Sequence, residues 1–127
     1  MSRIDVVCGV IINKNKVLIT QRGDKTNYGK WEFPGGKIKV GENEFSSIKR
    51  ELMEELNLQV TPLKKLTKYT HDHFNLIFIE CSCLEPKSIK LTEHTNYLWV
   101  KLDKLNDFDF LDGDKRFINH HLSLLGG

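Results

Sequence analysis

The 127-residue sequence has no apolar run that approaches the roughly 18 residues of a membrane-spanning helix. The apolar stretch near its amino end contains Asp5 and no cleavage site of small residues, which favours a strand over a signal peptide. Repeats, linkers and low-complexity segments are also missing. These absences predict a cytoplasmic protein with no membrane partner, folded as one domain over residues 1–127.

Cysteine is scarce, and its pattern argues against both disulfides and structural zinc. The three cysteines are Cys8, Cys81 and Cys83. A disulfide between residues two apart would be strained, and this C-x-C pair with scattered histidines supplies too few ligands for zinc. We therefore expect buried, reduced thiols on strands. His71 and His73 have the same spacing, and a solvated or substrate-facing pair at a strand end is favoured over a metal pair.

Neither sign of charge dominates the chain. The net charge is +2, from 19 basic and 17 acidic residues. This balance gives no indication of stable nucleic-acid binding, although it leaves room for a local basic patch near a site. The content of 39% hydrophobic and 28% charged residues is ordinary for a globular protein with its own apolar core.

Alternating and β-branched apolar residues predict that the middle of the chain is mostly sheet. Residues 4–12 and 17–21 are expected to form a hairpin around the polar tetrapeptide between them. Further strands are expected over residues 63–69, 76–83 and 97–100. A short extended piece over residues 31–33 is expected to stop at Pro34 and to bend at the glycine pair 35–36.

Two segments have helical periodicity. In the first, the apolar residues at intervals of three and four are Phe45, Ile48, Leu52 and Leu56. This amphipathic helix is expected to begin at Glu42 or Asn43. Asn57 is placed to end it, because asparagine tolerates the left-handed backbone that follows a helix. A second helix is expected over residues 115–125, after a polar break at residues 111–114.

Three glutamates of the first helix, Glu51, Glu54 and Glu55, are spaced to share one face. Carboxylates stacked in this way repel one another unless a cation lies between them. Oxygen-rich sites select hard cations, and magnesium in particular recruits substrate phosphates to complete its coordination. The Gly35-Gly36 turn would let a backbone carbonyl approach such a cation closely. The alternative is a solvated surface helix, which often has the same pattern.

The segment from Gly36 to Leu58 resembles the Nudix box, G-x5-E-x7-R-E-U-x-E-E-x-G-U, where U is aliphatic. The matching residues are Gly36, Glu42, Arg50, Glu51, Leu52, Glu54, Glu55 and Leu58. Asn57 stands where the pattern has its second glycine. Asparagine is the next best residue for a left-handed backbone, so the departure is mild.

The resemblance implies an α/β fold, namely an α/β/α sandwich with a mixed β-sheet between helices. It also implies that Mg²⁺ or Mn²⁺ is bound by Glu51, Glu54 and Glu55 with the carbonyl of Gly35 or Gly36. Arg50 would orient Glu51, and Glu42 would tie the loop to the helix. The catalytic residues carried over are Arg50, Glu51, Glu54 and Glu93. Glu93 would serve as a further ligand or a general base, whereas a loop carboxylate is otherwise only solvated.

Residues 31–38 are similar to the K-x-E-F-P-G-G-K-[IV] run of the MutT-like branch of this family. The substrate-binding residues that this implies are Arg22, Tyr28, Phe33, Asp112 and Asp114. Phe33 would pack against a base or lie in the core. Asp114 would accept hydrogen bonds from a guanine or from the cytosine amino group, and capping of the second helix is its alternative role.

The implied activity is metal-dependent hydrolysis of a nucleoside triphosphate to its monophosphate and pyrophosphate. The leading substrate is 8-oxo-dGTP, which would make the role nucleotide-pool sanitisation. The alternative within enzymes is CTP, dCTP or a modified pyrimidine triphosphate, and the alternative of another class is a non-catalytic nucleotide-binding regulator. The expected partner is a small nucleotide, and the chain is expected to be a monomer or homodimer.

Overall fold

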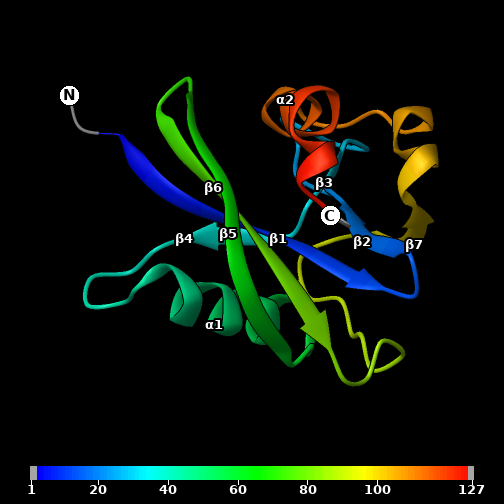
Figure 1. The fold of residues 1–127 in the computed structure, drawn as a ribbon, viewed down its shortest axis with the longest axis horizontal. Helices are drawn as coiled ribbons and strands as arrows, with labels where there is room; N and C mark the ends of the chain where they lie inside the picture. The colour runs from blue at the N-terminus through cyan, green and yellow to red at the C-terminus, as the bar shows by residue number, and fades with distance from the viewer. Residues whose placement is uncertain (1–2, 126–127) are drawn as a thin grey trace.

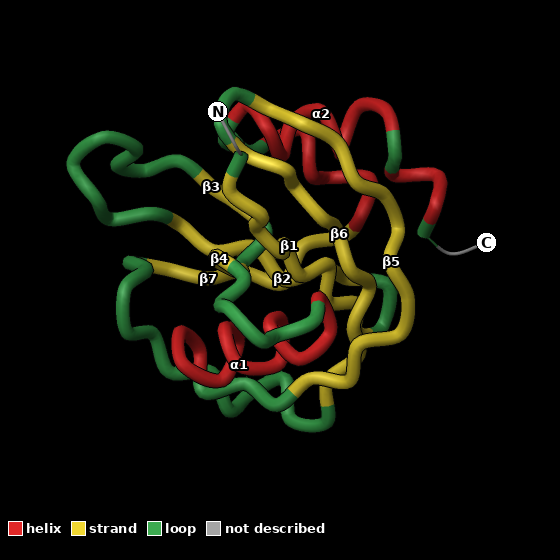
Figure 2. Tube along the Cα trace, turned by 90° about the vertical axis from the view of Figure 1, so that its left-hand side faces the viewer, coloured by secondary structure: helices red, strands yellow, loops and turns green. Residues whose placement is uncertain are grey.

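The computed structural model describes residues 3–125, in which seven strands form one mixed sheet between two helices. The strands are β1 (Ile4–Asn13), β2 (Lys16–Gln21), β3 (Trp31–Glu32), β4 (Gly35–Lys37), β5 (Val60–His71), β6 (Phe74–Cys83) and β7 (Asn96–Lys101). Helix α1 (Glu44–Leu56) covers one face, and α2 (Asp112–His120) covers the other (Figures 1 and 2). The expected α/β/α sandwich is therefore confirmed.

Strand β1 is the central strand and joins the two halves of the sheet. It pairs in parallel with β6 over Ile4 to Ile11, and antiparallel with β2 and with β4. Strands β5, β3 and β7 complete the order, with β5 beside β6 and both β3 and β7 beside β2. The parallel pair among antiparallel ones is what makes the sheet mixed.

Both faces of the sheet bury apolar side chains, since residues along a strand alternate between faces. On β6, Leu76 and Phe78 face the α2 side, whereas Ile77 and Ile79 face the α1 side. Cys8 and Cys81 are buried as free thiols in these two cores, as expected, and Cys83 is half-buried. The near-continuous apolar density of β1 and β6 follows from this burial on both faces.

Helix α1 has the two ends that its sequence predicts. The Asn43 side chain accepts a hydrogen bond from the backbone N–H of Ser46, and the Ser46 hydroxyl accepts one from the N–H of Asn43. Asn57 ends the helix in the left-handed region, with φ of 54°. One expectation for the apolar stripe is wrong, because Phe45 is exposed and Ser47 is buried instead.

Three other boundaries differ from the sequence-based expectations. Residues 35–37 form strand β4 on β1 rather than a bend, because the backbone there pairs with a segment distant in sequence. Helix α2 begins at Asp112 rather than Lys115 and ends at His120, followed by a short 3₁₀ helix, η2 (Leu122–Leu124). An unexpected 3₁₀ helix, η1 (Leu102–Asp107), follows β7.

Strands β1, β2, β5, β6 and β7 match their predicted positions and are one to three residues longer at their ends, whereas β3 is one residue shorter than the extended piece expected over residues 31–33. The hairpin turn is made by Lys14 and Asn15, both with positive φ, which is the backbone of a tight two-residue hairpin. Within residues 3–125, no helix is long and apolar enough to cross a membrane.

Candidate active site

Arg50 on α1 contacts three carboxylates, those of Glu42 before the helix and of Glu51 and Glu54 within it. Its guanidinium donates to Glu42 through Nε and Nη2, to Glu51 at 3.0 Å and to Glu54 at 3.1 Å. It also donates to the carbonyl oxygen of Lys37 on β4, at 3.1 Å. These contacts lower the pKa of Glu42 to about 2, chiefly through the hydrogen bond from Arg50. Arg50 thus orients the Glu51 carboxylate and ties the loop before α1 to the helix.

Strand β4 passes so close to α1 and β1 that a side chain on either of its two glycines would displace a neighbour. A Cβ on Gly36 would lie 2.4 Å from the carboxyl group of Glu51. A Cβ on Gly35 would lie 1.8 Å from the carbonyl oxygen of Val7 on β1. The Glu51 carboxylate is therefore held against bare backbone, the arrangement in which a backbone carbonyl and a carboxylate can share one cation.

Beside this strand lies a cavity of about 390 Å³, here named the acidic cavity. It is lined by Arg22, Gly23, Asp24, Glu32, Gly35, Glu55, Glu93 and His94. Four of these residues carry carboxylates, and Arg22 alone carries a permanent positive charge. The acidic cavity combines residues from β3, β4, α1 and the loop before β7.

Glu55 is the residue of the acidic cavity whose environment is most unfavourable without a ligand. Its Oε2 atom is buried and has no hydrogen-bond partner within the described residues. Burial, followed by the negative charges of Glu51, Glu32 and Glu93, raises its pKa to about 8. A buried carboxylate without a partner is costly, and a cation would relieve both the burial and the repulsion.

The carboxylates and backbone carbonyls at this site are the oxygen ligands that a hard divalent cation prefers. Without the cation, the carboxylates do not already surround one point. Over residues 3–125, no three His, Cys, Asp or Glu side chains already form a metal-binding cluster. Glu51 and Glu54 are engaged by Arg50, and the Glu54 side chain is 54% exposed. The groups that would hold the ion are Glu55 with its unpartnered oxygen, Glu51 against Gly36, the exposed carboxylate of Glu54 and a β4 carbonyl.

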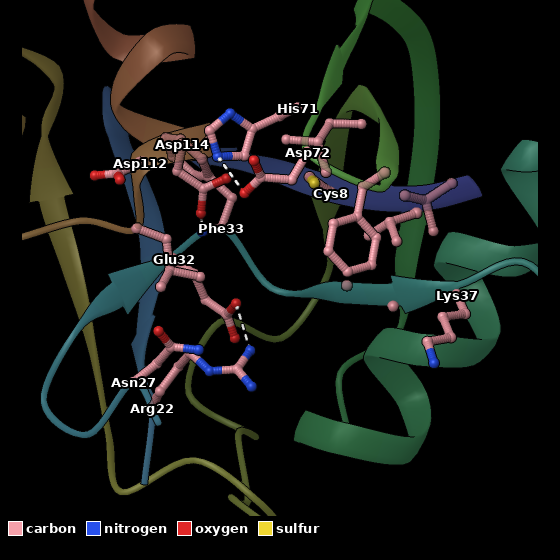
Figure 3. Close-up of a pocket in the computed structure, with 18 residues that line it drawn as sticks. Cys8, Arg22, Asn27, Glu32, Phe33, Lys37, His71, Asp72, Asp112 and Asp114 are labelled. Carbon is pink, nitrogen blue, oxygen red and sulfur yellow. Dashed lines mark hydrogen bonds and ion pairs between the residues drawn. The ribbon is translucent and has the colours of Figure 1, made fainter. Parts of the chain in front are cut away.

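A second cavity of about 460 Å³ adjoins the acidic cavity, and Figure 3 shows its lining. We name it the large cavity. Arg22, Glu32 and Gly35 line both cavities. The large cavity extends from there past Phe33 to Asp114 at the start of α2. Its volume suits a small organic ligand.

Asp114 is fully enclosed where the large cavity meets α2. Its Oδ2 accepts a hydrogen bond of 3.0 Å from the backbone N–H of Phe33. Burial, and then the charge of Glu32, raises the pKa of this carboxyl well above its ordinary value. The alternative role of Asp114 as a helix cap is wrong, because Leu111 occupies the N-cap position of α2. Asp112, also predicted, lines the cavity with its carboxylate exposed.

The two predicted aromatic contacts have different positions. Phe33 is buried in the core and packs against Phe78, Phe110 and Phe117, although it also lines the large cavity. Tyr28 is 73% exposed on the loop after β2 and lines neither cavity. In this structure the Tyr28 ring does not reach the cavity it was predicted to serve.

Several polar residues that line the cavities were not singled out from the sequence, among them Asn27, Glu32 and His94. His71, which the sequence offered as one of a solvated or substrate-facing pair, lines the large cavity. Glu32 and His94 are hydrogen-bonded at 2.8 Å across 62 positions of sequence. The available signals were that Glu32 lies within the MutT-like run and that His94 directly follows Glu93.

Comparisons with known proteins agree with this geometry. Residues 2–121 match the NUDIX domain. An 8-oxo-dGTP diphosphatase of Buchnera aphidicola subsp. Schizaphis graminum is 36% identical over 122 residues, which cover 94% of this chain and 93% of that protein. A CTP pyrophosphohydrolase of Escherichia coli strain K12 is 39% identical over 62 residues, which cover 48% of this chain and 46% of that protein.

Solved structures show the same fold. A MutT structure, from work on Aliivibrio salmonicida and Vibrio cholerae, has a TM-score of 0.80 and 27% identity, covering 96% of this chain and 98% of that chain. The solution structure of the E. coli ORF135 protein has a TM-score of 0.81 at 22% identity, covering 99% and 93%, and bears on the fold alone. The chain therefore belongs to the Nudix family of hydrolases.

Proposed function

We propose that this Nudix hydrolase converts a nucleoside triphosphate to its monophosphate and pyrophosphate with Mg²⁺ or Mn²⁺, and that its leading substrate is 8-oxo-dGTP. The observation that carries the proposal is that the two cavities lie side by side and share Arg22, Glu32 and Gly35 in their linings. A nucleoside in the large cavity would place its phosphates in the acidic cavity. The 36% identical relative named 8-oxo-dGTP diphosphatase supports the choice of substrate.

Glu51, Glu54 and Glu55, with a carbonyl of Gly35 or Gly36, are the residues that we propose hold the cation. When bound there, a divalent cation neutralises the diphosphate and lowers the pKa of an adjacent water. Nudix hydrolases generally use divalent metal cations. Arg50 keeps the Glu51 carboxylate turned toward β4. Glu93 lines the same cavity and is available to accept a proton from the attacking water.

We propose that Asp114 and Arg22 select the nucleotide. A carboxyl with a raised pKa offers both an O–H donor and an acceptor, so a buried Asp114 can read a base edge as an asparagine would. Arg22 stands at the junction of the cavities, where it can contact the sugar or a phosphate. Phe33 lines the large cavity, and its side chain is buried in the core.

The second candidate substrate is CTP, dCTP or a modified pyrimidine triphosphate. The observation in its favour is the carboxyl of Asp114, which also suits the amino group of cytosine, together with the relative named CTP pyrophosphohydrolase. That relative matches only 48% of this chain, so it gives weaker support than the relative that matches almost all of it.

A panel of 8-oxo-dGTP, dGTP, CTP, dCTP and 5-methyl-dCTP, with Mg²⁺ and product analysis, tests the proposal. We expect the highest kcat/KM for 8-oxo-dGTP, with pyrophosphate rather than orthophosphate released. Preference for a cytosine nucleotide would favour the second candidate, and no turnover of any member would contradict both. Glu54→Gln separates catalysis from binding alone, since we expect lost turnover with nucleotide binding retained.

A further inference from the structure

Glu32 occupies the wall between the two cavities and is fully engaged there. Its Oε1 accepts a hydrogen bond of 3.0 Å from Nη1 of Arg22, and its Oε2 lies 2.8 Å from Nε2 of His94. The side chains of Glu32 and His94 are only 13% and 6% exposed. Figure 3 shows Arg22 and Glu32 turned toward each other at the edge of the large cavity. Charge-assisted contacts with so little exposure are strong and hold their partners in place.

Arg22 is fixed by two acidic neighbours through two of its three guanidinium nitrogens. Its Nε donates to Asp24 at 2.8 Å, and its Nη1 is engaged by Glu32. Within the part of the chain that the structure describes, Nη2 has no hydrogen-bond partner. A guanidinium held by two of its nitrogens has its third nitrogen in a defined position, and Arg22 lines both cavities.

His94 belongs to the loop that carries Glu93, and this loop is anchored at three points. At one end, the N–H of Thr92 donates to the carbonyl of Glu55 at the end of α1, at 3.2 Å. At the other end, the N–H of Thr95 donates to the carbonyl of Gln21 at the end of β2, at 3.0 Å. Between them, His94 bonds to Glu32. Glu93, next to this middle anchor, faces the acidic cavity.

The second ring nitrogen of His94 strengthens the case for a role at the site. Nδ1 is buried and has no hydrogen-bond partner in the described residues, although His94 lines the acidic cavity. A fold that needed only apolar filling at this point would not leave a buried nitrogen without a partner. Such unpaired buried groups are typical of sites completed by a ligand or an ordered water.

We propose that Glu32 and His94 are positioning residues for the hydrolysis. Glu32 fixes Arg22 between the two cavities, and His94 locks the loop that presents Glu93 onto the same carboxylate. The buried Glu32 carboxylate thereby positions both the Arg22 guanidinium and, through His94, the Glu93 carboxylate, which come from different loops. The kinetic part of this proposal rests on the proposed function, whereas its structural part does not.

Amide hydrogen exchange tests the structural part without any substrate. In His94→Leu, we expect the exchange of the Thr92 and Thr95 amides to accelerate about tenfold or more, because a buried charge-assisted bond is lost. In His94→Gln, whose amide can still donate to Glu32, exchange should stay near that of the wild type. His120→Leu, at an exposed position on α2, is the matched control. Unchanged exchange in His94→Leu would overturn the proposed anchor.

Glu32 is tested through the side chain of Arg22. The Nη1–H signal of Arg22, which reports the bond to Glu32, should be protected from exchange in the wild type and should lose that protection in Glu32→Gln. Glu80→Gln, on β6 and outside both cavities, is the matched control for the loss of one carboxylate. Protection of Arg22 that survives Glu32→Gln would show that Asp24 alone fixes the guanidinium, and it would contradict the role given to Glu32.

Kinetics with the nucleotide that the wild type hydrolyses best tests the functional part. We expect His94→Leu and Glu32→Gln each to lower kcat/KM about 10- to 100-fold, and His94→Gln to restore it to within about threefold of wild type. In a Glu93→Gln background, His94→Leu should lower kcat/KM much less than it does in the wild type, because His94 acts by positioning the Glu93 carboxylate, which that background lacks. Equal costs in both backgrounds, or no rescue by glutamine, would overturn the proposal. If the wild type hydrolyses no nucleotide, the proposed function is wrong, and the exchange measurements still decide the positioning role.

Discussion

Asp114 illustrates how one buried side chain serves the fold and the proposed nucleotide site together. Its carboxyl satisfies the backbone N–H of Phe33, which lies between β3 and β4 and would otherwise be unpaired in the interior. Burial keeps that carboxyl protonated above its ordinary pKa of 3.8. The same atoms that close the core therefore form the end wall of the large cavity.

The raised pKa of Asp114 predicts a pH-dependent loss of stability. The folded state binds the proton of the Asp114 carboxyl more tightly than the unfolded state does. The contribution of this protonated carboxyl to the free energy of unfolding is therefore complete below about pH 3.8 and declines as pH rises through the folded pKa. Asp114→Asn retains the acceptor for Phe33 and has no proton to lose. The free energy of unfolding of Asp114→Asn should therefore increase relative to wild type as pH rises from about 4 through the raised folded pKa, as measured by urea denaturation. A difference that is constant with pH would contradict this assignment.

Because the pKa of Glu55 is raised, we expect metal binding to release a proton from its carboxyl group. Its pKa of about 8 in the absence of a cation means that most molecules carry a protonated Glu55 at pH 7, whereas a metal ligand must be ionised. Calorimetry with Mn²⁺ in two buffers of different ionisation enthalpy should detect release of on the order of one proton at pH 7. Glu55→Gln should abolish this release, and Glu44→Gln should leave it intact. Proton release on Mn²⁺ binding that persists in Glu55→Gln would show that the proton comes from another group.

At the scale of elements, strand β4 has the most demanding local geometry. Gly35 lies against the backbone of Val7, whereas Gly36 lies against the carboxyl group of Glu51, so substitution by alanine has different consequences at the two positions. The carbonyl of Val7 is fixed within β1, whereas the Glu51 carboxyl is the end of a flexible side chain.

We expect Gly35→Ala to destabilise the protein by about 2 kcal/mol or more, since β1 and β4 must separate. Gly36→Ala should leave the melting temperature nearly unchanged and displace Glu51, with a loss of activity of about tenfold or more. Thermal unfolding and kinetics on both variants check this. Equal destabilisation by the two substitutions would show that Gly36 serves the sheet rather than Glu51.

Helix α1 offers a separate test, because Asn57 is its one departure from the Nudix box. Asn57 has φ of 54°, and its N–H donates to the carbonyls of Leu52 and Met53 in the helix. Asn57→Ala should therefore cost about 1 kcal/mol of stability, while Asn57→Gly should be within about 0.5 kcal/mol of wild type. Activity should be unaffected by the glycine. A strongly destabilised Asn57→Gly would mean that the side chain, not the backbone conformation, ends the helix.

Across the whole molecule, the sequence predicted those features whose causes are local. The ends of α1 follow from Asn43 and Asn57, and the carboxylate face follows from helical spacing, so both were predicted. Strand β4 was missed because its partner on β1 lies about thirty residues earlier, and no local pattern specifies that pairing. The Glu32 to His94 contact spans 62 positions, and Asp114 reaches Phe33 across 81. These links exist only once the sheet has formed.

The central claim is that the carboxylates of α1 support cleavage of a nucleoside triphosphate into monophosphate and pyrophosphate. The most direct measurement quantifies the products of the best substrate of the panel with Mg²⁺, for wild type, Glu51→Gln and the matched control Glu44→Gln. We predict equal amounts of monophosphate and pyrophosphate from wild type and control, and a rate lower by about 100-fold or more for Glu51→Gln. Orthophosphate as the main product, or a wild-type rate for Glu51→Gln, would contradict the account.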